Sequence, residues 1–239
     1  MRSSPLATLV SMAVLGGGGI AAVAALAGPL IGAGQWYAWK TAAVFAGMMA
    51  VACAAIARWH PHRVLGAANA VTTIRVMGVA LIAGLVGEPA TVHAAWAALA
   101  VTAVIVGFDG VDGWLARRDR TTSVFGASYD METDAFLILV LTVLVWQHDK
   151  AGGWVLAGGV MRYGFVAAGW WWPWMAAPLG SSLRGKAVAV AFIVGLVVAL
   201  APIVPVPFSG AAAALVLGAL AWSFSVDIRW LYGRRGVEG

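Results

Sequence analysis

Acidic residues in this chain are concentrated in one short segment. Residues 109–134 hold six of its ten Asp and Glu residues. Four of these form two closely spaced pairs that offer only oxygen ligands: Asp109 with Asp112, and Asp130 with Asp134. Oxygen ligands select hard divalent cations such as Mg2+ or Mn2+, and two such ions can bridge a diphosphate during a displacement at phosphorus. The segment therefore predicts a metal-dependent site for phosphoryl-type chemistry.

Helical periodicity places the first pair and its neighbours on a shared face. At 100° per residue, about 100° of arc carries Asp109, Asp112, Gly113 and Ala116, with Arg117 just beyond. A helix over this stretch would therefore present two carboxylates, two small residues and one cation to the same partner.

The second pair lies on a stripe of another helix. Gly126, Asp130 and Asp134 fall at about 0°, 40° and 80° around the axis, whereas Glu132 points roughly the opposite way. Glu132 is therefore left out of the predicted site. Four carboxylates that face one another repel unless cations lie between them, which is a second reason to expect metal ions.

Composition decides the setting of this site. The chain is 62% hydrophobic and 10% charged with a mean hydropathy of +0.89, so it lacks the charged residues from which a soluble surface is built. Apolar runs long enough to cross about 30 Å of hydrocarbon recur near 6–27, 37–57, 64–86, 90–116, 128–147, 152–175, 186–203 and 209–231. These runs predict an all-α, polytopic membrane helical bundle with about eight transmembrane helices.

The distribution of Lys and Arg predicts the orientation. If the chain starts inside and crosses eight times, eleven of these residues fall in cytoplasmic segments and only Lys40 and Lys150 on the other side. Arg75 and Arg162 lie within predicted spans, where a cation is costly unless it meets polar partners. The run 90–108 is about 28 Å long as a helix, so Asp109 would lie where the hydrocarbon ends. The acidic segment is expected to face the cytoplasm.

The same segment fits a known signature without insertion or deletion. Its frame is Asp109, two residues, Asp112-Gly113, two residues, Ala116-Arg117, eight residues, Gly126, three residues, Asp130, three residues and Asp134. Average residue usage would give these eight fixed positions in roughly 1 window in 10^9 or fewer. The frame closely resembles that of the CDP-alcohol phosphotransferases, also called CDP-alcohol phosphatidyltransferases. This resemblance covers about residues 64–231, a six-helix core.

The resemblance implies a role for each aspartate. Asp109, Asp112 and Asp130 would hold two Mg2+ or Mn2+ ions. Asp134 would be the general base that deprotonates the acceptor alcohol, and it could also ligate a metal. The implied reaction is attack of an alcohol on the phosphorus that bears the lipid or alcohol group of a CDP-alcohol, with CMP leaving.

Other positions of the frame would bind the donor. Three small residues would let the nucleotide or diphosphate lie against the helix backbone, namely Gly113, Ala116 and Gly126, and Arg117 would hold phosphate. The stretch Asn69-x-x-Thr72-x-x-Arg75 is similar to a pattern in the family's first core helix, although Ala68 stands where relatives have proline. Asn69 and Thr72 would approach the nucleotide; the alternative is that they form polar contacts between helices.

Three basic residues outside the frame are candidates for the acceptor pocket. Arg162 would bind a phosphate or polar headgroup of the acceptor, or alternatively form a salt bridge with Asp227 or Asp134. Arg184 and Lys186 lie in a stretch similar to an element of relatives that make phosphatidylglycerophosphate, without the threonine that follows it there. The alternative is that they are ordinary cytoplasmic charges.

These observations predict a two-helix N-terminal extension over residues 1–60 and the family core over 61–235. The first helix could also be a cleaved signal peptide. The favoured donor is CDP-diacylglycerol and the acceptor a small alcohol, in phospholipid biosynthesis; a soluble CDP-alcohol with a lipid acceptor is the alternative. An ion-coupled transporter and a non-catalytic membrane scaffold are alternatives from other classes. Membrane lipids explain the excess of positive charge without nucleic acid, and the resemblance implies that a homodimer can form.

Overall fold

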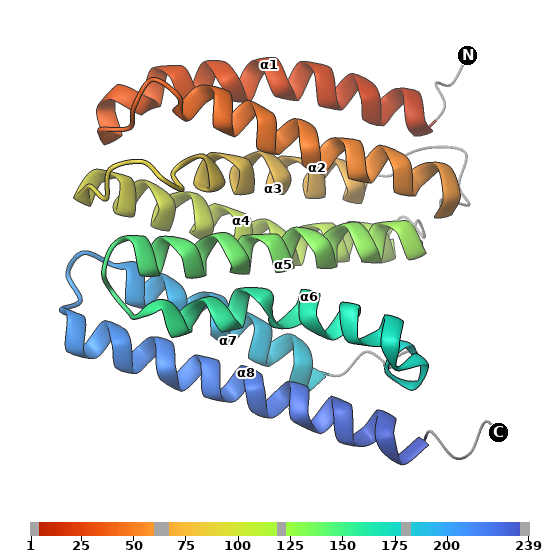
Figure 1. Ribbon diagram of the computed structural model, residues 1–239. Coiled ribbons are helices and arrows are strands. Elements are labelled where there is room, and N and C mark those ends of the chain that lie inside the picture. Colours follow the sequence, from red (N-terminus) through yellow and green to blue (C-terminus); the bar gives the residue numbers. More distant parts are fainter. Residues whose placement is uncertain (1–4, 60–66, 119–122, 178–182, 235–239) are drawn as a thin grey trace. The chain divides into compact units, whose positions relative to one another are not determined.

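The computed structural model describes residues 5–59, 67–118, 123–177 and 183–234. Within these ranges it describes the backbone but not the side chains of residues 57–59, 67, 111–113 and 116–117. Over these ranges the chain forms eight α-helices and two short 3-10 helices (Figure 1). Their bounds are α1 Pro5–Ile31, α2 Tyr37–Trp59, α3 Ala67–Gly84, α4 Val92–Arg118, α5 Val124–Gln147, η1 Gly153–Val155, α6 Leu156–Trp171, η2 Pro173–Ala176, α7 Leu183–Leu200 and α8 Val206–Arg234. The expected all-α architecture is confirmed.

Within the described ranges, five helices are long and apolar enough to cross a membrane. They are Pro5–Ile31, Tyr37–Ile56, Val92–Gly110, Leu183–Leu200 and Val206–Arg234, and Ala68–Gly84 forms a shorter apolar helix. Large apolar side chains on α1 are exposed to an extent that a soluble protein avoids, with Leu15, Leu26 and Leu30 each more than three-quarters exposed. The chain is therefore a multi-pass membrane protein, whereas eight crossings remain a prediction.

The span expected over 152–175 is not one continuous helix. Helix α6 ends at Trp171, and Trp172 is extended, with φ −120° and ψ 90°, before the turn of η2. Pro173 is the cause, because the proline ring disfavours the helical conformation in the residue that precedes it. The continuous α-helical part is only 16 residues long.

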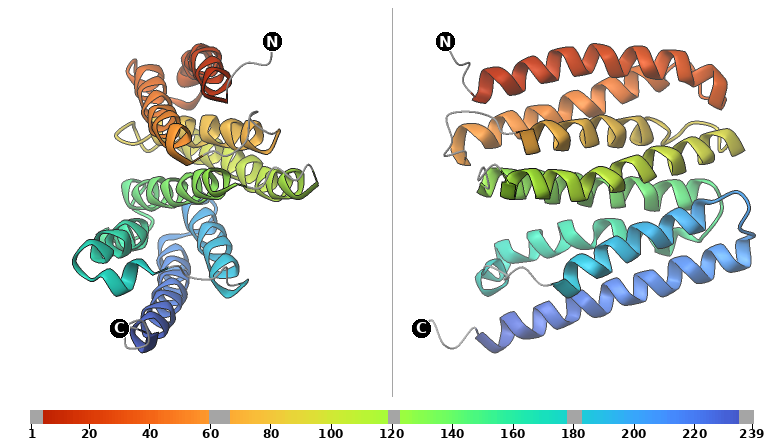
Figure 2. Two further views of the ribbon diagram at one scale, coloured as in Figure 1. Left: turned by 90° about the vertical axis from the view of Figure 1, so that its right-hand side faces the viewer. Right: turned by 180° about the vertical axis from the view of Figure 1, so that it is seen from behind.

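The helices form two compact units, Met1–Leu137 and Ile138–Gly239, with the division inside α5. In the first unit, α1 packs on α2, α2 on α3, and α3 on α4 (Figure 2). Small residues permit this packing: a Cβ on Gly84 of α3 would lie 2.2 Å from Oγ1 of Thr41 on α2. A larger residue at 84 would separate the two helices.

In the second unit, α7 packs along α8, and η2 contacts both α6 and α8. The Lys150 ammonium donates hydrogen bonds to the carbonyl oxygens of Ala201, at 3.0 Å, and Val204, at 2.7 Å. The Ser209 hydroxyl donates to the Lys150 carbonyl at 2.6 Å. These bonds join the loop after α5 to the loop between α7 and α8 and to the first turn of α8.

Candidate functional site

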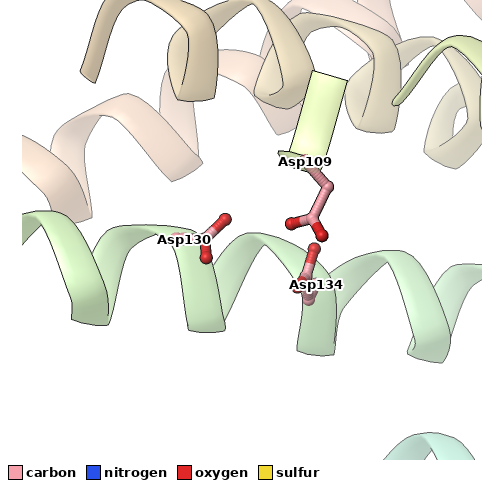
Figure 3. Close-up of side chains that lie close together, drawn as sticks. All are labelled: Asp109, Asp130 and Asp134. Carbon is pink, nitrogen blue, oxygen red and sulfur yellow. The ribbon is translucent and has the colours of Figure 1, made fainter. Parts of the chain in front are cut away.

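Two helices of the first unit bring three aspartates together. Helix α4 carries Asp109, and helix α5, which begins after the Ser123 cap, carries Asp130 and Asp134. The Ser123 hydroxyl accepts a hydrogen bond from the Gly126 N–H at 3.0 Å, which is the usual way a serine starts a helix. Figure 3 shows Asp130 and Asp134 one turn apart on α5, with the Asp109 carboxylate directed toward them from α4. One oxygen from each carboxylate lies within 4.8 Å of the others.

Arg75 of α3 joins the three carboxylates from the buried side. Its guanidinium lies 2.9 Å from Oδ1 of Asp109, with Nη2 as the nearest nitrogen, and it forms ion pairs with Asp130 and Asp134. The Arg75 side chain is 1% exposed, whereas the three carboxylate side chains are 33 to 39% exposed. The guanidinium therefore contacts the carboxylates from the protein interior, and the carboxylates themselves are partly exposed.

The charges of this cluster favour a divalent cation. Three carboxylates against one guanidinium leave a net charge of about −2. The donor set consists of carboxylate oxygens alone, which hard cations prefer. Ligands at about 2.1 Å on opposite sides of a Mg2+ ion are about 4.2 Å apart, and the three aspartate oxygens are already within a comparable distance of one another. The residues present fit a metal centre.

The start of α5 also meets α3 beside this cluster. A Cβ on Gly126 would lie 3.3 Å from Oδ1 of Asn69, so the glycine lets the amide side chain approach the α5 backbone closely. Asn69 and Thr72 are both buried, and the Thr72 hydroxyl donates to the Ala68 carbonyl at 3.1 Å. The structure thus places Asn69 beside Gly126, as two residues of the predicted donor site.

Other predicted site residues fall elsewhere. Asp112, Gly113, Ala116 and Arg117 belong to α4, but their side chains lie outside the described residues. Glu132 is exposed on α5 and is not part of the aspartate cluster. The predicted helical phasing agrees with this placement.

The three acceptor candidates lie in the second unit. Arg162 is a half-buried residue of α6, and Lys186 is an exposed residue of α7. Arg184 of α7 forms an ion pair with Asp227 of α8, and its guanidinium lies 5.8 Å from the centre of the Trp222 ring. The two carboxylates considered as partners for Arg162, Asp227 and Asp134, are paired with Arg184 and Arg75 respectively.

Arg75 is the component that sequence reasoning did not include in the site. Two signals pointed to it: an arginine inside a predicted span, and its place at the end of the Asn69-x-x-Thr72-x-x-Arg75 pattern. An arginine within a span requires polar partners. The acidic segment, with its unbalanced negative charge, was the partner to consider.

The aspartate cluster lies within a region that matches a known protein family. The family model for CDP-alcohol phosphatidyltransferase matches residues 65–226, which is more than half of the chain and includes all three clustered aspartates and Arg75. The chain belongs to the CDP-alcohol phosphatidyltransferase family. Comparison with curated proteins and with solved structures finds no significant match. As a CDP-alcohol phosphatidyltransferase, the protein is a transferase of phosphate-containing groups from a family that generally depends on divalent metal.

Proposed function

We propose that this protein transfers a phosphatidyl group from CDP-diacylglycerol to a small alcohol and releases CMP, as a step of phospholipid biosynthesis. The observation that carries the proposal is the group of three carboxylates around the buried Arg75, in a membrane protein of this family. A soluble CDP-alcohol with a lipid acceptor is the alternative that uses the same catalytic groups.

Asp109, Asp112 and Asp130 would hold two ions of Mg2+ or Mn2+, and Asp134 could also ligate one of them. Bound there, the metal supplies positive charge that neutralises the diphosphate and its leaving oxygen. Arg75 holds the carboxylates in a common orientation from the buried side. Transfer of this kind depends mainly on positioning and charge neutralisation, so a rigid arrangement of these oxygens is what the chain must provide.

Asp134 is the proposed general base. It would accept the proton of the acceptor hydroxyl as the oxygen attacks phosphorus, and the bond from phosphorus to the CMP oxygen would break. Asp134 is one-third exposed and lies one turn along α5 from Asp130. A carboxylate that is accessible to an incoming alcohol and adjacent to the metal ligands suits this role.

The donor would lie against the starts of α3 and α5. Gly126 has no side chain to obstruct a nucleotide or diphosphate, and the Asn69 amide lies beside it. Asn69 and Thr72 would contact the nucleotide, together with Gly113, Ala116 and Arg117 of α4. Arg117 would bind phosphate, because a guanidinium offers paired donors that match phosphate oxygens.

The acceptor would be bound by cations of the second unit. Arg162, Arg184 and Lys186 are the proposed residues, and a phosphorylated alcohol is the acceptor class that such cations favour. We further propose that the site faces the cytoplasm, on the basis of the Lys and Arg distribution. A homodimer is the proposed assembly, by analogy with the family.

The test is CMP release by purified protein in detergent with Mg2+ and CDP-diacylglycerol, against a panel of alcohols and phosphorylated alcohols. Acceptor-dependent CMP is expected from wild type and from Asp149→Asn, an exposed aspartate of the second unit, but not from Asp109→Asn. Activity only with a soluble CDP-alcohol would establish the alternative donor. No CMP release with either donor class would favour the scaffold interpretation.

A further inference from the structure

The two N-terminal helices lie outside the family match, which begins at residue 65, yet they belong to the same compact unit as the aspartate cluster. A merely appended helix pair would contact the core through apolar surfaces of low specificity. Instead, α1 and α2 are attached to the core at two separate places, and each attachment uses polar side chains.

The first attachment is at the loop between α3 and α4. The Glu88 carboxylate accepts a hydrogen bond from the Gly34 N–H at 2.5 Å and forms an ion pair with Lys40. Burial raises the pKa of Glu88, but the Lys40 contact and the Gly34 N–H outweigh it and hold the pKa below its usual value. The Thr91 hydroxyl donates to the Ile31 carbonyl at 2.6 Å. This end of the helix pair is thus fixed to the core by charge and by hydrogen bonds.

The second attachment is at Tyr129, the residue before Asp130. The Tyr129 hydroxyl lies 3.2 Å from the hydroxyl of Thr73 on α3 and 3.5 Å from the sulfur of Met49 on α2. The Tyr129 ring stacks on Phe125 at 5.6 Å between centroids. One phenol therefore contacts α2, α3 and its own helix within hydrogen-bonding or van der Waals distance.

A buried apolar cluster surrounds this contact. It includes residues from α1, α2, α3 and α5: Leu9, Ile20, Phe45, Met49, Ala52, Ile56, Val76, Ala80, Phe125 and Tyr129. Met49 is 1% exposed and Tyr129 is 8% exposed. Interiors of this kind are close-packed and transmit displacement, so a change at Met49 is felt at Tyr129.

We propose that α1 and α2 are part of the catalytic unit, and that Met49 and Tyr129 act as positioning residues for Asp130 and Asp134. Tyr129 fixes the rotation of α5 about its own axis, and its position along that axis, relative to α2 and α3. Asp130 follows Tyr129 directly, and Asp134 lies one turn further along the same rigid helix. Metal–ligand distances lie within about 0.2 Å of their ideal values in real sites, so a movement of Tyr129 that displaces these carboxylates should weaken metal binding. The inference rests on the metal site of the proposed function.

The experiment measures Mn2+ affinity by electron paramagnetic resonance, and thermal unfolding, on the full-length protein in detergent. Met49→Ala is expected to weaken Mn2+ binding about tenfold, since it leaves a cavity against Tyr129. Met49→Leu, which conserves volume, is expected to restore it. Tyr129→Phe keeps the ring and removes only the hydroxyl, so it tests the same attachment if Met49→Ala does not fold.

Met175→Ala is the matched control, because Met175 is also buried, at 8% exposure, but lies in the second unit. It should lower the unfolding temperature and leave Mn2+ affinity unchanged. If Met49→Ala and Tyr129→Phe bind Mn2+ as tightly as wild type, the positioning role is wrong while the proposed function stands. If wild type binds no Mn2+, or if Asp109→Asn leaves Mn2+ binding intact, the proposed function fails, and this inference fails with it.

Discussion

Two arginines of this protein meet aspartates between helices, and they differ in the charge that remains. Arg75 is 1% exposed and contacts Asp109, Asp130 and Asp134, so its cluster carries a net charge of about −2. Arg184 is 28% exposed and forms an ion pair with one carboxylate of the described residues, that of Asp227, so the two charges balance. A neutral pair needs no further ion, whereas the Arg75 cluster attracts additional positive charge.

The difference separates a structural ion pair from a site. An arginine inside a helical membrane protein is costly without polar partners, and both arrangements provide such partners. Only the Arg75 cluster combines a buried cation with carboxylates that remain one-third or more exposed. An excess of accessible ligand oxygens, and not the presence of an ion pair, is the feature that indicates metal-dependent chemistry.

The largest effect is expected from Asp134→Asn. Asparagine keeps the size of the side chain but cannot accept a proton, so kcat should fall by about 10^2 to 10^4. Donor and Mn2+ binding should remain, as measured by calorimetry on the same samples. Loss of Mn2+ binding would instead mean that Asp134 acts first as a metal ligand. The neutral pair offers the control: Asp227→Asn should lower kcat far less.

Arg75→Met and Arg184→Met compare the two arginines directly. Removing the buried Arg75 leaves three adjacent carboxylates without their cation, which should lower the free energy of unfolding by about 3 to 5 kcal/mol. The same change at the partly exposed Arg184 should cost about 1 kcal/mol or less.

Mg2+ should stabilise both variants, because both keep the three aspartates, by about 2.7 kcal/mol where its concentration is a hundredfold its Kd. At one fixed Mg2+ concentration the gain should be larger for Arg75→Met, whose carboxylates have lost the cation that competes with the metal. Unfolding in detergent with Mg2+ and with EDTA measures both. Equal losses for the two arginines, with equal gains from Mg2+, would show that the charge excess at Arg75 is unimportant.

Much of this arrangement was predictable from the sequence, because helices in membranes have strong local signals. Apolar length predicted the helices, and the 100° period predicted that Asp130 and Asp134 share a face while Glu132 does not. The interruption at Pro173 was also a local signal, but the surrounding tryptophans concealed it within an apolar run. The sequence did not reveal which cation contacts which carboxylate, because that depends on how the helices pack against one another. From the sequence, Arg162 was considered as a partner for Asp134 or Asp227, whereas the structure pairs these two aspartates with Arg75 and Arg184.

The acceptor candidates are expected to differ in importance for the same reason. Arg162→Ala should raise the KM of the acceptor about tenfold, with little change in the KM of the donor, as loss of one charge-assisted contact would do. Arg184→Ala should raise it less, since the Arg184 charge is already neutralised by Asp227. Initial rates over a grid of both substrates give the two constants. A larger effect on the donor would place Arg162 in a different pocket.

Glu132→Gln should have the smallest effect, with kcat and Mn2+ affinity within about twofold of wild type, as for surface substitutions remote from a site. Glu132 is only two residues from both Asp130 and Asp134, but two residues correspond to about 200° of helical rotation, so helical geometry places this exposed residue on another face of α5. The variant therefore tests whether the position of a carboxylate around α5 matters, or only its presence on that helix. A large loss of activity would mean either that α5 presents another face to the substrate or that a negative charge on α5 matters wherever it lies.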